Sequence, residues 1–417
     1  MEKMYDMTEQ QERVILVAVN DCDDEAAVNE SLDELAELVA TAGAETAGRM
    51  VQNRDKIHPG TYVGTGKIEE LKNAIEMLEA TGIVCDDELS PAQLKNLEQE
   101  LGTKVMDRTL IILDIFAKRA TTKEGKIQVE LAQLKYRAAR LVGLRSSLSR
   151  LGGGIGTRGP GEKKLEIDRR LINDRIAVLR REVDELSNHR ELAREKRKKN
   201  PIPVVAIVGY TNAGKSTLLN TMTNAGILEE DKLFATLDPT TRNYKLPGGQ
   251  EILLTDTVGF IRKLPHHLID AFRSTLEEAK YADIILHVID SSNPQMDSHM
   301  EIVYETLQNL GVKDKPVITF FNKQDKLPED FHGIFKDLKA DYTIGGSIKQ
   351  GKGLEKLAEI LEMIIREQSV YVEKVIPYDQ AGKIQLIRQY GQLLSEEYVE
   401  NGISVKGTIP KELEGKI

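Results

Sequence analysis

Cysteine is scarce in this chain of 417 residues, which contains only Cys22 and Cys85. Two cysteines provide neither a disulfide framework nor a metal cluster, so we expect both to be ordinary buried thiols. Long apolar runs are also missing, because none approaches the roughly 18 residues that a membrane-spanning helix requires. The first segment, residues 1–12, is too charged for a signal peptide. These absences predict a cytoplasmic protein without stable membrane insertion. We expect a monomer, because no sequence feature suggests a symmetric dimer.

An excess of positive charge is absent from the chain as a whole, which has a formal net charge of −10. The charges are unevenly distributed, because residues 137–199 contain 18 Lys and Arg against 9 Asp and Glu. This stretch therefore has a net charge of +9, and the remainder has −19. One basic block in an acidic chain is compatible with a nucleic-acid partner.

The clearest motif begins at Gly209 and reads Gly-Tyr-Thr-Asn-Ala-Gly-Lys-Ser. It matches the phosphate-loop pattern, and the apolar run at 203–208 precedes it as a buried strand would. The glycines allow a tight bend around a phosphate, and backbone amides at a helix N-terminus face the anion. Lys215 would reach the outer phosphates, while the Ser216 hydroxyl would bind Mg²⁺. The expected nucleotide contacts are Gly209, Tyr210, Thr211, Asn212, Ala213, Gly214, Lys215, Ser216 and Thr217.

A second motif follows the strand-like run at 251–255 and consists of Asp256, Thr257, Val258 and Gly259. The Asp256 carboxylate can hold Mg²⁺ through water, and the Gly259 amide can contact a γ-phosphate. The polar segment 234–242 lies where a switch loop must supply a threonine to Mg²⁺. Three threonines compete for that role, namely Thr236, Thr240 and Thr241. The nucleotide contacts expected from this segment are Phe234, Ala235, Thr236, Leu237 and Asp238.

A third motif predicts that the base is guanine. Residues 316–321 form a strand-like run that leads to Asn322, Lys323, Gln324 and Asp325. The Asp325 carboxylate can accept two hydrogen bonds from guanine, whereas adenine has no matching donor pair. The segment Ser347-Ile348-Lys349 resembles the Ser-Ala-Lys loop of GTPases, whose backbone contacts the guanine oxygen, but it has Ile348 in place of alanine and Gly345-Gly346 before it. The nucleotide contacts expected from these two segments are Asn322, Lys323, Asp325, Ser347, Ile348 and Lys349.

The residue after Gly259 is Phe260, which cannot orient a water molecule as a glutamine would. Phosphoryl transfer to water depends on positioning and charge stabilisation, which we assign to Lys215, Gly259 and the threonine of segment 234–242 that binds Mg²⁺. Intrinsic GTP hydrolysis should therefore be slow and conditional on switch-loop backbone or on a partner that orders the water. The nearby His266 and His267 are weaker candidates for this role.

Residues 119–199 contain two series of apolar residues at spacings of three and four, which predict an antiparallel helical hairpin. Each helix of about 25 residues would be roughly 38 Å long. The tip, 152–161, is longer than a tight turn requires and is rich in glycine. This length favours binding to a phosphate-rich surface over a flexible turn with solvated charges. The expected binding residues are Arg145, Arg150, Gly152, Gly153, Gly154, Arg158, Lys163 and Lys164.

The remaining segments complete an α/β protein. Residues 1–118 alternate strand-like and helix-like segments, as in an α/β domain. Within them, Gly60 to Lys67 could be a second phosphate loop, but its spacing favours a turn before a helix. Residues 200–366 predict a P-loop GTPase domain with a mostly parallel sheet and helices on both faces. Residues 367–417 predict a small α+β domain.

These motifs closely resemble the HflX family of translational GTPases. The resemblance rests on the hairpin tip, the switch segment 234–242, residues 256–265 and the turn at 64–67, and it spans roughly 60–400. It implies binding to rRNA of the large ribosomal subunit, with the tip near the peptidyl transferase centre. It also implies separation of stalled or idle ribosomes into subunits, with GTP hydrolysis used mainly for release. Among the three threonines it selects Thr236 as the Mg²⁺ ligand.

Two other functions remain compatible with the sequence. One is a GTPase that assists ribosome assembly or RNA modification, and the other is a signalling GTPase with a protein or membrane partner. The glycine-rich tip argues weakly against a membrane, because Leu151 and Ile155 are its only bulky apolar residues.

Overall fold

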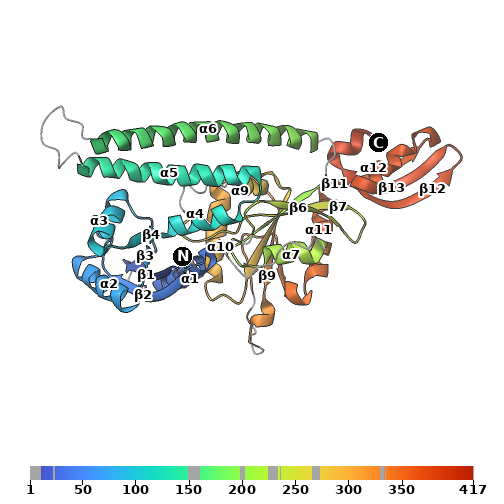
Figure 1. Ribbon diagram of the computed structural model, residues 1–417. Coiled ribbons are helices and arrows are strands. Elements are labelled where there is room, and N and C mark those ends of the chain that lie inside the picture. The colour runs from blue at the N-terminus through green and yellow to red at the C-terminus, as the bar shows by residue number, and fades with distance from the viewer. Residues whose placement is uncertain are drawn as a thin grey trace, which may run out of the picture. The chain divides into compact units, whose positions relative to one another are not determined.

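The computed structural model describes residues 11–21, 24–148, 160–197, 202–223, 233–234, 236–264, 273–328, 333 and 335–416. The chain forms two compact units, shown in Figure 1. The first comprises Met1–Asp184 with Arg262–Ala271, and the second comprises Glu185–Ile261 with Phe272–Ile417. Among the described residues, no helix combines the length and the apolar character needed to cross a membrane.

The first unit contains a four-stranded parallel sheet with the order β2-β1-β3-β4. Its strands are β1 (Arg13–Asn20), β2 (Glu45–Asn53), β3 (Gly82–Cys85) and β4 (Lys104–Asp107). Its helices are α1 (Glu25–Ala42), α2 (Thr65–Met77), α3 (Pro91–Leu101) and α4 (Arg108–Arg119). Cys85 is buried, as expected, whereas Cys22 lies outside the described residues. The segment after β2 forms a turn in which His58 and Tyr62 are bridged, and α2 begins at Thr65.

A buried charge cluster lies at the carboxyl ends of β3 and β4. Arg108 is 1% exposed and forms ion pairs with Asp86 and Glu34. Lys263, which belongs to the same unit, lies 2.5 Å from Asp86 and 2.6 Å from Asp87. Burial alone would raise the pKa of Asp86, but Arg108 and Lys263 outweigh it and lower this pKa below its usual value. The side chains of this cluster are therefore charged, and their positive and negative charges offset one another.

Two long helices, α5 (Lys123–Leu148) and α6 (Pro160–Arg197), follow. Arg175 of α6 donates two hydrogen bonds to Glu130 of α5, so the helices lie side by side, as in Figure 1. The expectation of about 25 residues for each helix is wrong for α6, which has 38 residues. Its apolar series ends near 186, but the helix continues through a charged segment because Glu, Arg, Lys and Ala favour helix. The start of α6 also includes the last two residues of the expected tip.

The second unit contains a six-stranded sheet with the order β10-β9-β8-β5-β7-β6. Its strands are β5 (Val204–Val208), β6 (Thr240–Lys245), β7 (Glu251–Asp256), β8 (Ile284–Asp290), β9 (Val317–Asn322) and β10 (Tyr342–Gly345). Its helices include α7 (Lys215–Thr223), α9 (Arg273–Tyr281), α10 (Met296–Asn309) and α11 (Leu354–Glu367). All strand pairs except β6–β7 are parallel, so the predicted P-loop α/β fold class is confirmed.

The strand β6 was not predicted, because its segment is polar and lacks alternation of apolar residues. It lies at the edge of the sheet and pairs only with β7, in antiparallel orientation. An edge strand can be polar because one of its sides faces solvent. Thr240 and Thr241 are therefore part of a strand rather than of a loop.

The same unit also contains a three-stranded antiparallel sheet with the order β11-β13-β12. The strands are β11 (Ser369–Ile376), β12 (Gln392–Val399) and β13 (Gly402–Pro410), and the helix α12 (Gly382–Tyr390) packs against them. Ile387 of α12 and Val405 and Ile409 of β13 are fully buried in its core. The small α+β fold predicted for the end of the chain is confirmed.

Candidate nucleotide-binding site

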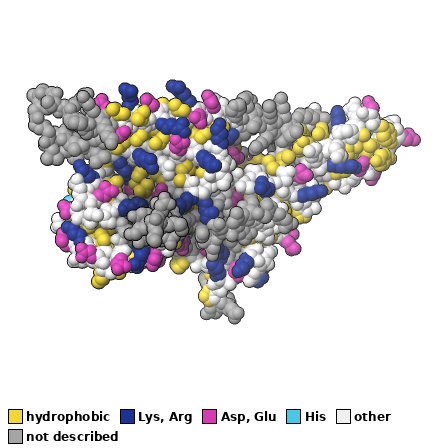
Figure 2. Space-filling view, in the orientation of Figure 1, with side chains coloured by type: hydrophobic (Ala, Val, Ile, Leu, Met, Phe, Trp, Pro, Cys, Tyr) yellow, Lys and Arg dark blue, Asp and Glu magenta, His cyan; other side chains and the backbone are white. Residues whose placement is uncertain are grey.

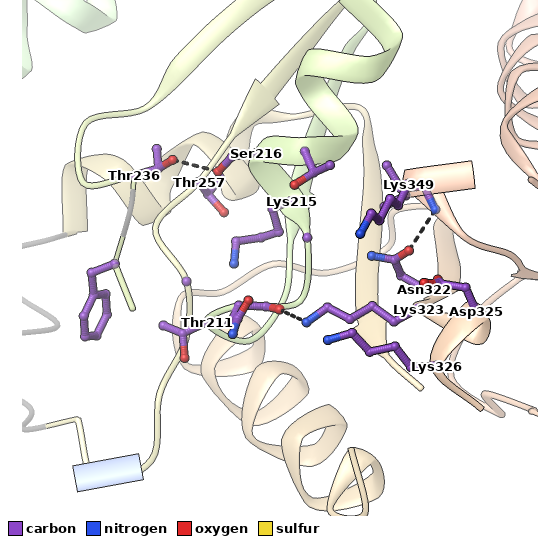
Figure 3. Close-up of a pocket in the computed structure, with 16 residues that line it drawn as sticks. Thr211, Lys215, Ser216, Thr236, Thr257, Asn322, Lys323, Asp325, Lys326 and Lys349 are labelled. Carbon is purple, nitrogen blue, oxygen red and sulfur yellow. Dashed lines mark hydrogen bonds between the residues drawn. The ribbon is translucent and has the colours of Figure 1, made fainter. Parts of the chain in front are cut away.

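Sixteen residues of the second unit line a pocket of about 360 Å³, shown in Figure 3. They come from the phosphate loop (209–216) and the residue after it, from segments next to β6 and β7, and from the loops after β9 and β10. The lining residues are Thr211, Asn212, Gly214, Lys215, Ser216, Thr217, Phe234, Thr236, Thr257, Gly259, Asn322, Lys323, Asp325, Lys326, Ile348 and Lys349. Fifteen of them belong to the set predicted from the sequence.

Eight other residues of the predicted set do not line the pocket. They are Gly209, Tyr210, Ala213, Leu237, Asp238, Asp256, Val258 and Ser347. Ala235 lies outside the described residues. Three of the eight contact residues that line the pocket. Asp256 contacts Ser216, Tyr210 contacts Lys215, and Ser347 contacts Asp325.

The phosphate loop takes its shape from two glycines. Gly209 has φ 154°, and a Cβ atom there would lie 2.2 Å from the Val288 carbonyl oxygen. Gly214 has φ 101°, and a Cβ atom would lie 2.4 Å from Nδ2 of Asn322. Both backbone angles favour glycine, and a side chain would meet the backbone of β8 at Gly209 and the Asn322 side chain at Gly214. The helix α7 begins at Lys215, so its free amides face the loop.

The Lys215 side chain is 7% exposed, and its Nζ donates a hydrogen bond of 2.7 Å to the Tyr210 carbonyl oxygen. Burial lowers the pKa of Lys215 to about 8, although Asp256 acts in the opposite direction. Figure 3 shows Lys323, Lys326 and Lys349 extending toward the same cavity. A pocket with four lysines suits a polyanionic ligand such as a nucleoside triphosphate.

We expect GDP affinity to fall as the pH rises above about 8, because the neutral form of Lys215 cannot attract phosphate. Bound phosphate favours the charged amine and raises its pKa, so binding at about pH 9 should take up a proton. Titration calorimetry in buffers of different ionisation enthalpy would measure this uptake. The Lys215→Met protein is the control and should show no such uptake. An affinity that stays constant from about pH 7 to pH 9 would contradict the assignment.

Asp256 at the end of β7, Ser216 of α7 and Thr236 before β6 form a group that fits a magnesium ion. The Asp256 Oδ2 atom accepts hydrogen bonds from Ser216 Oγ at 2.8 Å and from Thr236 Oγ1 at 2.9 Å. Its other oxygen, Oδ1, is buried and has no hydrogen-bond partner. Burial raises the pKa of Asp256, which nearby positive charge would counteract. Hydroxyl and carboxylate oxygens are the hard donors that Mg²⁺ prefers.

The three candidate threonines lie in different places in the structure. The Thr236 hydroxyl lies 2.9 Å from that of Ser216. In contrast, Thr241 Oγ1 lies 2.9 Å from Thr255 Oγ1 within the β6–β7 pair, and Thr240 pairs with Asp256 through the backbone. Only Thr236 of the three also lines the pocket. Within the described part of the chain, no cluster of three His, Cys, Asp or Glu residues could hold a metal ion.

Asn322 connects two loops at the end of the pocket where we expect the base. Its Nδ2 donates to the Ala213 carbonyl at 2.9 Å, and its Oδ1 accepts from the Ile348 amide at 3.0 Å. Asp325 is exposed at the pocket edge, and a hydrogen bond from Ser347 lowers the pKa of its carboxyl group. The Asp325 carboxylate is therefore ionised and available as a double acceptor, as guanine recognition requires.

The differences between segment 345–348 and the Ser-Ala-Lys loop of GTPases have a structural explanation. The Ile348 side chain is 1% exposed and packs into the core of the unit, so only its backbone faces Asn322. A Cβ atom on Gly346 would lie 2.2 Å from the Lys352 carbonyl oxygen, so this position requires glycine. Isoleucine at position 348 is larger than alanine, but its side chain packs into the core and therefore leaves the polar face of the loop unchanged.

Phe260 does not take part in the pocket, because its side chain is 2% exposed and does not line it. Its backbone instead pairs with the phosphate loop, where Phe260 N donates to Gly209 O and Thr211 N donates to Phe260 O. A Cβ atom on Gly259 would lie 2.9 Å from Lys215 Nζ. Gly259 therefore lies directly beside Lys215. His266 and His267 lie outside the described residues.

Lys326, which lines the pocket immediately after Asp325, was not among the residues predicted from the sequence. Its position next to Asp325 of the guanine-recognition motif could have indicated this role.

Of the residues predicted for the hairpin tip, Arg145 lies on α5, and Lys163 and Lys164 lie on α6. The other predicted tip residues, Arg150, Gly152, Gly153, Gly154 and Arg158, lie outside the described residues.

Three parts of the chain match protein-family models. Residues 29–117 match the GTP-binding GTPase N-terminal family, 119–197 the GTP-binding GTPase Middle Region and 204–323 the 50S ribosome-binding GTPase family.

Similar proteins cover nearly the whole chain. A protein named GTPase HflX from Lacrimispora saccharolytica is 67% identical over 413 residues, which cover 99% of this chain and 97% of that protein. GTPase HflX from Caldanaerobacter subterraneus subsp. tengcongensis is 50% identical over 414 residues, with coverage of 99% and 95%. A crystal structure of a GTP-binding protein from Sulfolobus solfataricus in complex with GDP is 26% identical, with a TM-score of 0.44 and coverage of 85% and 98%.

Proposed function

The chain belongs to the HflX family of GTPases, and on this basis we propose that it binds the large ribosomal subunit and separates stalled or idle ribosomes into subunits. As a member of this family it binds GTP and hydrolyses it. The observation that carries the ribosome proposal is the joining of a guanine-nucleotide site to a long basic hairpin in one chain. The GTP site supplies a switch, and the hairpin supplies a surface for RNA phosphates.

The surface of the hairpin supports an RNA partner. Figure 2 shows Lys and Arg side chains among hydrophobic and acidic ones over the two long helices. On α6, Arg169, Arg170, Arg180 and Arg181 are exposed. The apolar side chains of Ile167 and Leu171 are 58% and 60% exposed on the same helix. Arginine binds phosphate and stacks on bases, and an apolar side chain can contact an unstacked base.

We assign the four regions of the chain separate tasks. Residues 1–118 and the hairpin 119–199 would bind the ribosome, with the tip directed at rRNA near the peptidyl transferase centre. Residues 200–366 would be the GTPase domain, and 367–417 a small accessory domain. In the GTPase domain Ser216 and Thr236 would bind Mg²⁺ directly and Asp256 through water. The ion would neutralise phosphate charge, while Lys215 and the Gly259 amide hold the γ-phosphate in place.

We expect large ribosomal subunits to stimulate GTP hydrolysis at least about 10-fold, because Phe260 leaves the attacking water without a side chain to orient it. Deletion of residues 152–159 should abolish the stimulation and leave basal turnover unchanged. A second variant, Arg150→Ala with Arg158→Ala, retains the length of the tip and removes two phosphate contacts. The measurements are GTP turnover with and without purified subunits, and separation of 70S ribosomes by sedimentation.

The controls distinguish the parts of this proposal. Arg49→Ala removes an exposed arginine of the first unit that pairs with Asp33, and it should retain full stimulation. Stimulation that survives the tip deletion would remove the tip from the activation mechanism. An absence of stimulation in the unaltered chain would contradict the ribosome proposal and favour an assembly or signalling role.

A further inference from the structure

Tyr210, the second residue of the phosphate loop, stacks on His299 of α10. The ring centroids are 3.7 Å apart, and the ring planes differ by 4°. Tyr210 is 7% exposed, so its ring is almost completely buried. Tyr210 is not among the residues that line the pocket. Its contribution to the site must come through its backbone.

The peptide groups around Tyr210 connect two functional parts of the pocket. Its carbonyl oxygen accepts the 2.7 Å hydrogen bond from Lys215 Nζ. On either side, Gly209 O accepts from Phe260 N at 3.1 Å, and Thr211 N donates to Phe260 O at 2.8 Å. Phe260 directly follows Gly259, whose amide would contact the γ-phosphate. A rotation of the Tyr210 peptide would therefore displace both Lys215 and the Gly259 segment.

The backbone holds this peptide through the bridge between Tyr210 and Phe260. Gly209 precedes Tyr210, and glycine has the widest range of backbone angles of any residue. The stacked Tyr210 ring adds a side-chain contact that limits rotation of the peptide next to this glycine. Its partner His299 lies on a fixed element, because Met300, Val303 and Leu307 bury one face of α10. Stacked aromatic rings restrict the orientation of one another as well as adding attraction.

We propose that His299 is a positioning residue for GTP hydrolysis, which holds the Tyr210 peptide so that Lys215 and Gly259 keep their mutual arrangement. The imidazole acts through Tyr210 and does not contact the nucleotide. Because the transition state requires closer alignment than binding does, the effect falls on the hydrolysis rate rather than on affinity. This role concerns the intrinsic reaction and is independent of the ribosome proposal.

The test compares three variants in single-turnover GTP hydrolysis. His299→Leu keeps bulk on α10 and removes the ring, and it should slow hydrolysis about 3- to 10-fold, which is the range expected for an aromatic pair. His299→Phe restores a ring and should recover most of the rate. Glu301→Ala changes an exposed residue of the same helix and should behave as the unaltered chain. GDP affinity should change less than about twofold in all three.

The alternatives give different results. Hydrolysis by His299→Leu at the unaltered rate would overturn the proposal. Equal impairment of the Leu and Phe variants would also overturn it, because a ring would then not suffice. A parallel loss of GDP affinity and rate in His299→Leu would show general damage to the loop rather than positioning. Thermal unfolding of each variant establishes that the protein is folded, and if His299→Leu fails to fold, His299→Gln takes its place.

Discussion

Lys215→Met is expected to weaken GTP binding by about 10- to 100-fold, the loss typical for a buried charge-assisted hydrogen-bond donor. Lys215 is almost completely buried at the phosphate end of the pocket, and it lies beside Gly259. Methionine has a similar length and no charge, so the shape of the loop should be retained. Without the ammonium group, the hydrolysis rate of the bound GTP should fall as well, because charge on the γ-phosphate is no longer stabilised.

The measurement is fluorescence titration with a labelled GTP analogue, followed by single-turnover hydrolysis at saturating nucleotide. Lys326→Met is the matched control, because Lys326 lines the pocket next to the guanine-recognition residue. We expect only a few-fold loss of affinity for the control. Equal affinities for the unaltered and Lys215→Met proteins would show that Lys215 does not bind phosphate.

Asp325→Asn is expected to lower GTP affinity by on the order of 100-fold or more and to raise the affinity for xanthosine triphosphate. The carboxylate of Asp325 accepts two hydrogen bonds from guanine, at N1 and at the exocyclic amine. An amide offers one acceptor and one donor, so it leaves the exocyclic amine facing another donor. Xanthine has a carbonyl oxygen at that position and therefore complements the amide.

Competition titrations with GTP, xanthosine triphosphate and ATP would measure this change in base specificity. Asp297→Asn alters an exposed carboxylate of the same unit, on α10, and should leave specificity unchanged. If Asp325→Asn binds GTP as well as the unaltered chain does, guanine recognition must lie elsewhere. If Asp325→Asn weakens the binding of GTP and of xanthosine triphosphate to the same extent, the loop around Ser347 is disrupted instead.

The main features of the nucleotide pocket were predictable from local sequence. Fifteen of the residues that line it lie in motifs in which spacing determines chemistry. The glycines at 209 and 214 are required by backbone angles and close contacts that other residue types cannot adopt. Buried parallel strands before each motif also have a clear signature, because both faces of such strands are apolar. These patterns are local, so no knowledge of packing is needed to recognise them.

Features that depend on contact between distant segments were less predictable. The sequence did not distinguish Thr236 from Thr240 and Thr241 without the family resemblance. The distinction arises because β6 pairs with β7 and takes two of the three threonines into the sheet. The length of α6 was underestimated for a related reason, since charged residues without an apolar series can still continue a helix that is already formed.

The sequence by itself determined the order of the motifs, the class of nucleotide and the presence of a basic hairpin. Each of these follows from residue types at short spacing, which act through local backbone geometry and charge. The tertiary structure alone decided that Ile348 packs into the core, that Lys326 lines the pocket and that His299 stacks on Tyr210. These contacts join segments far apart in the chain, so they exist only where the folded sheet and its helices bring the segments together.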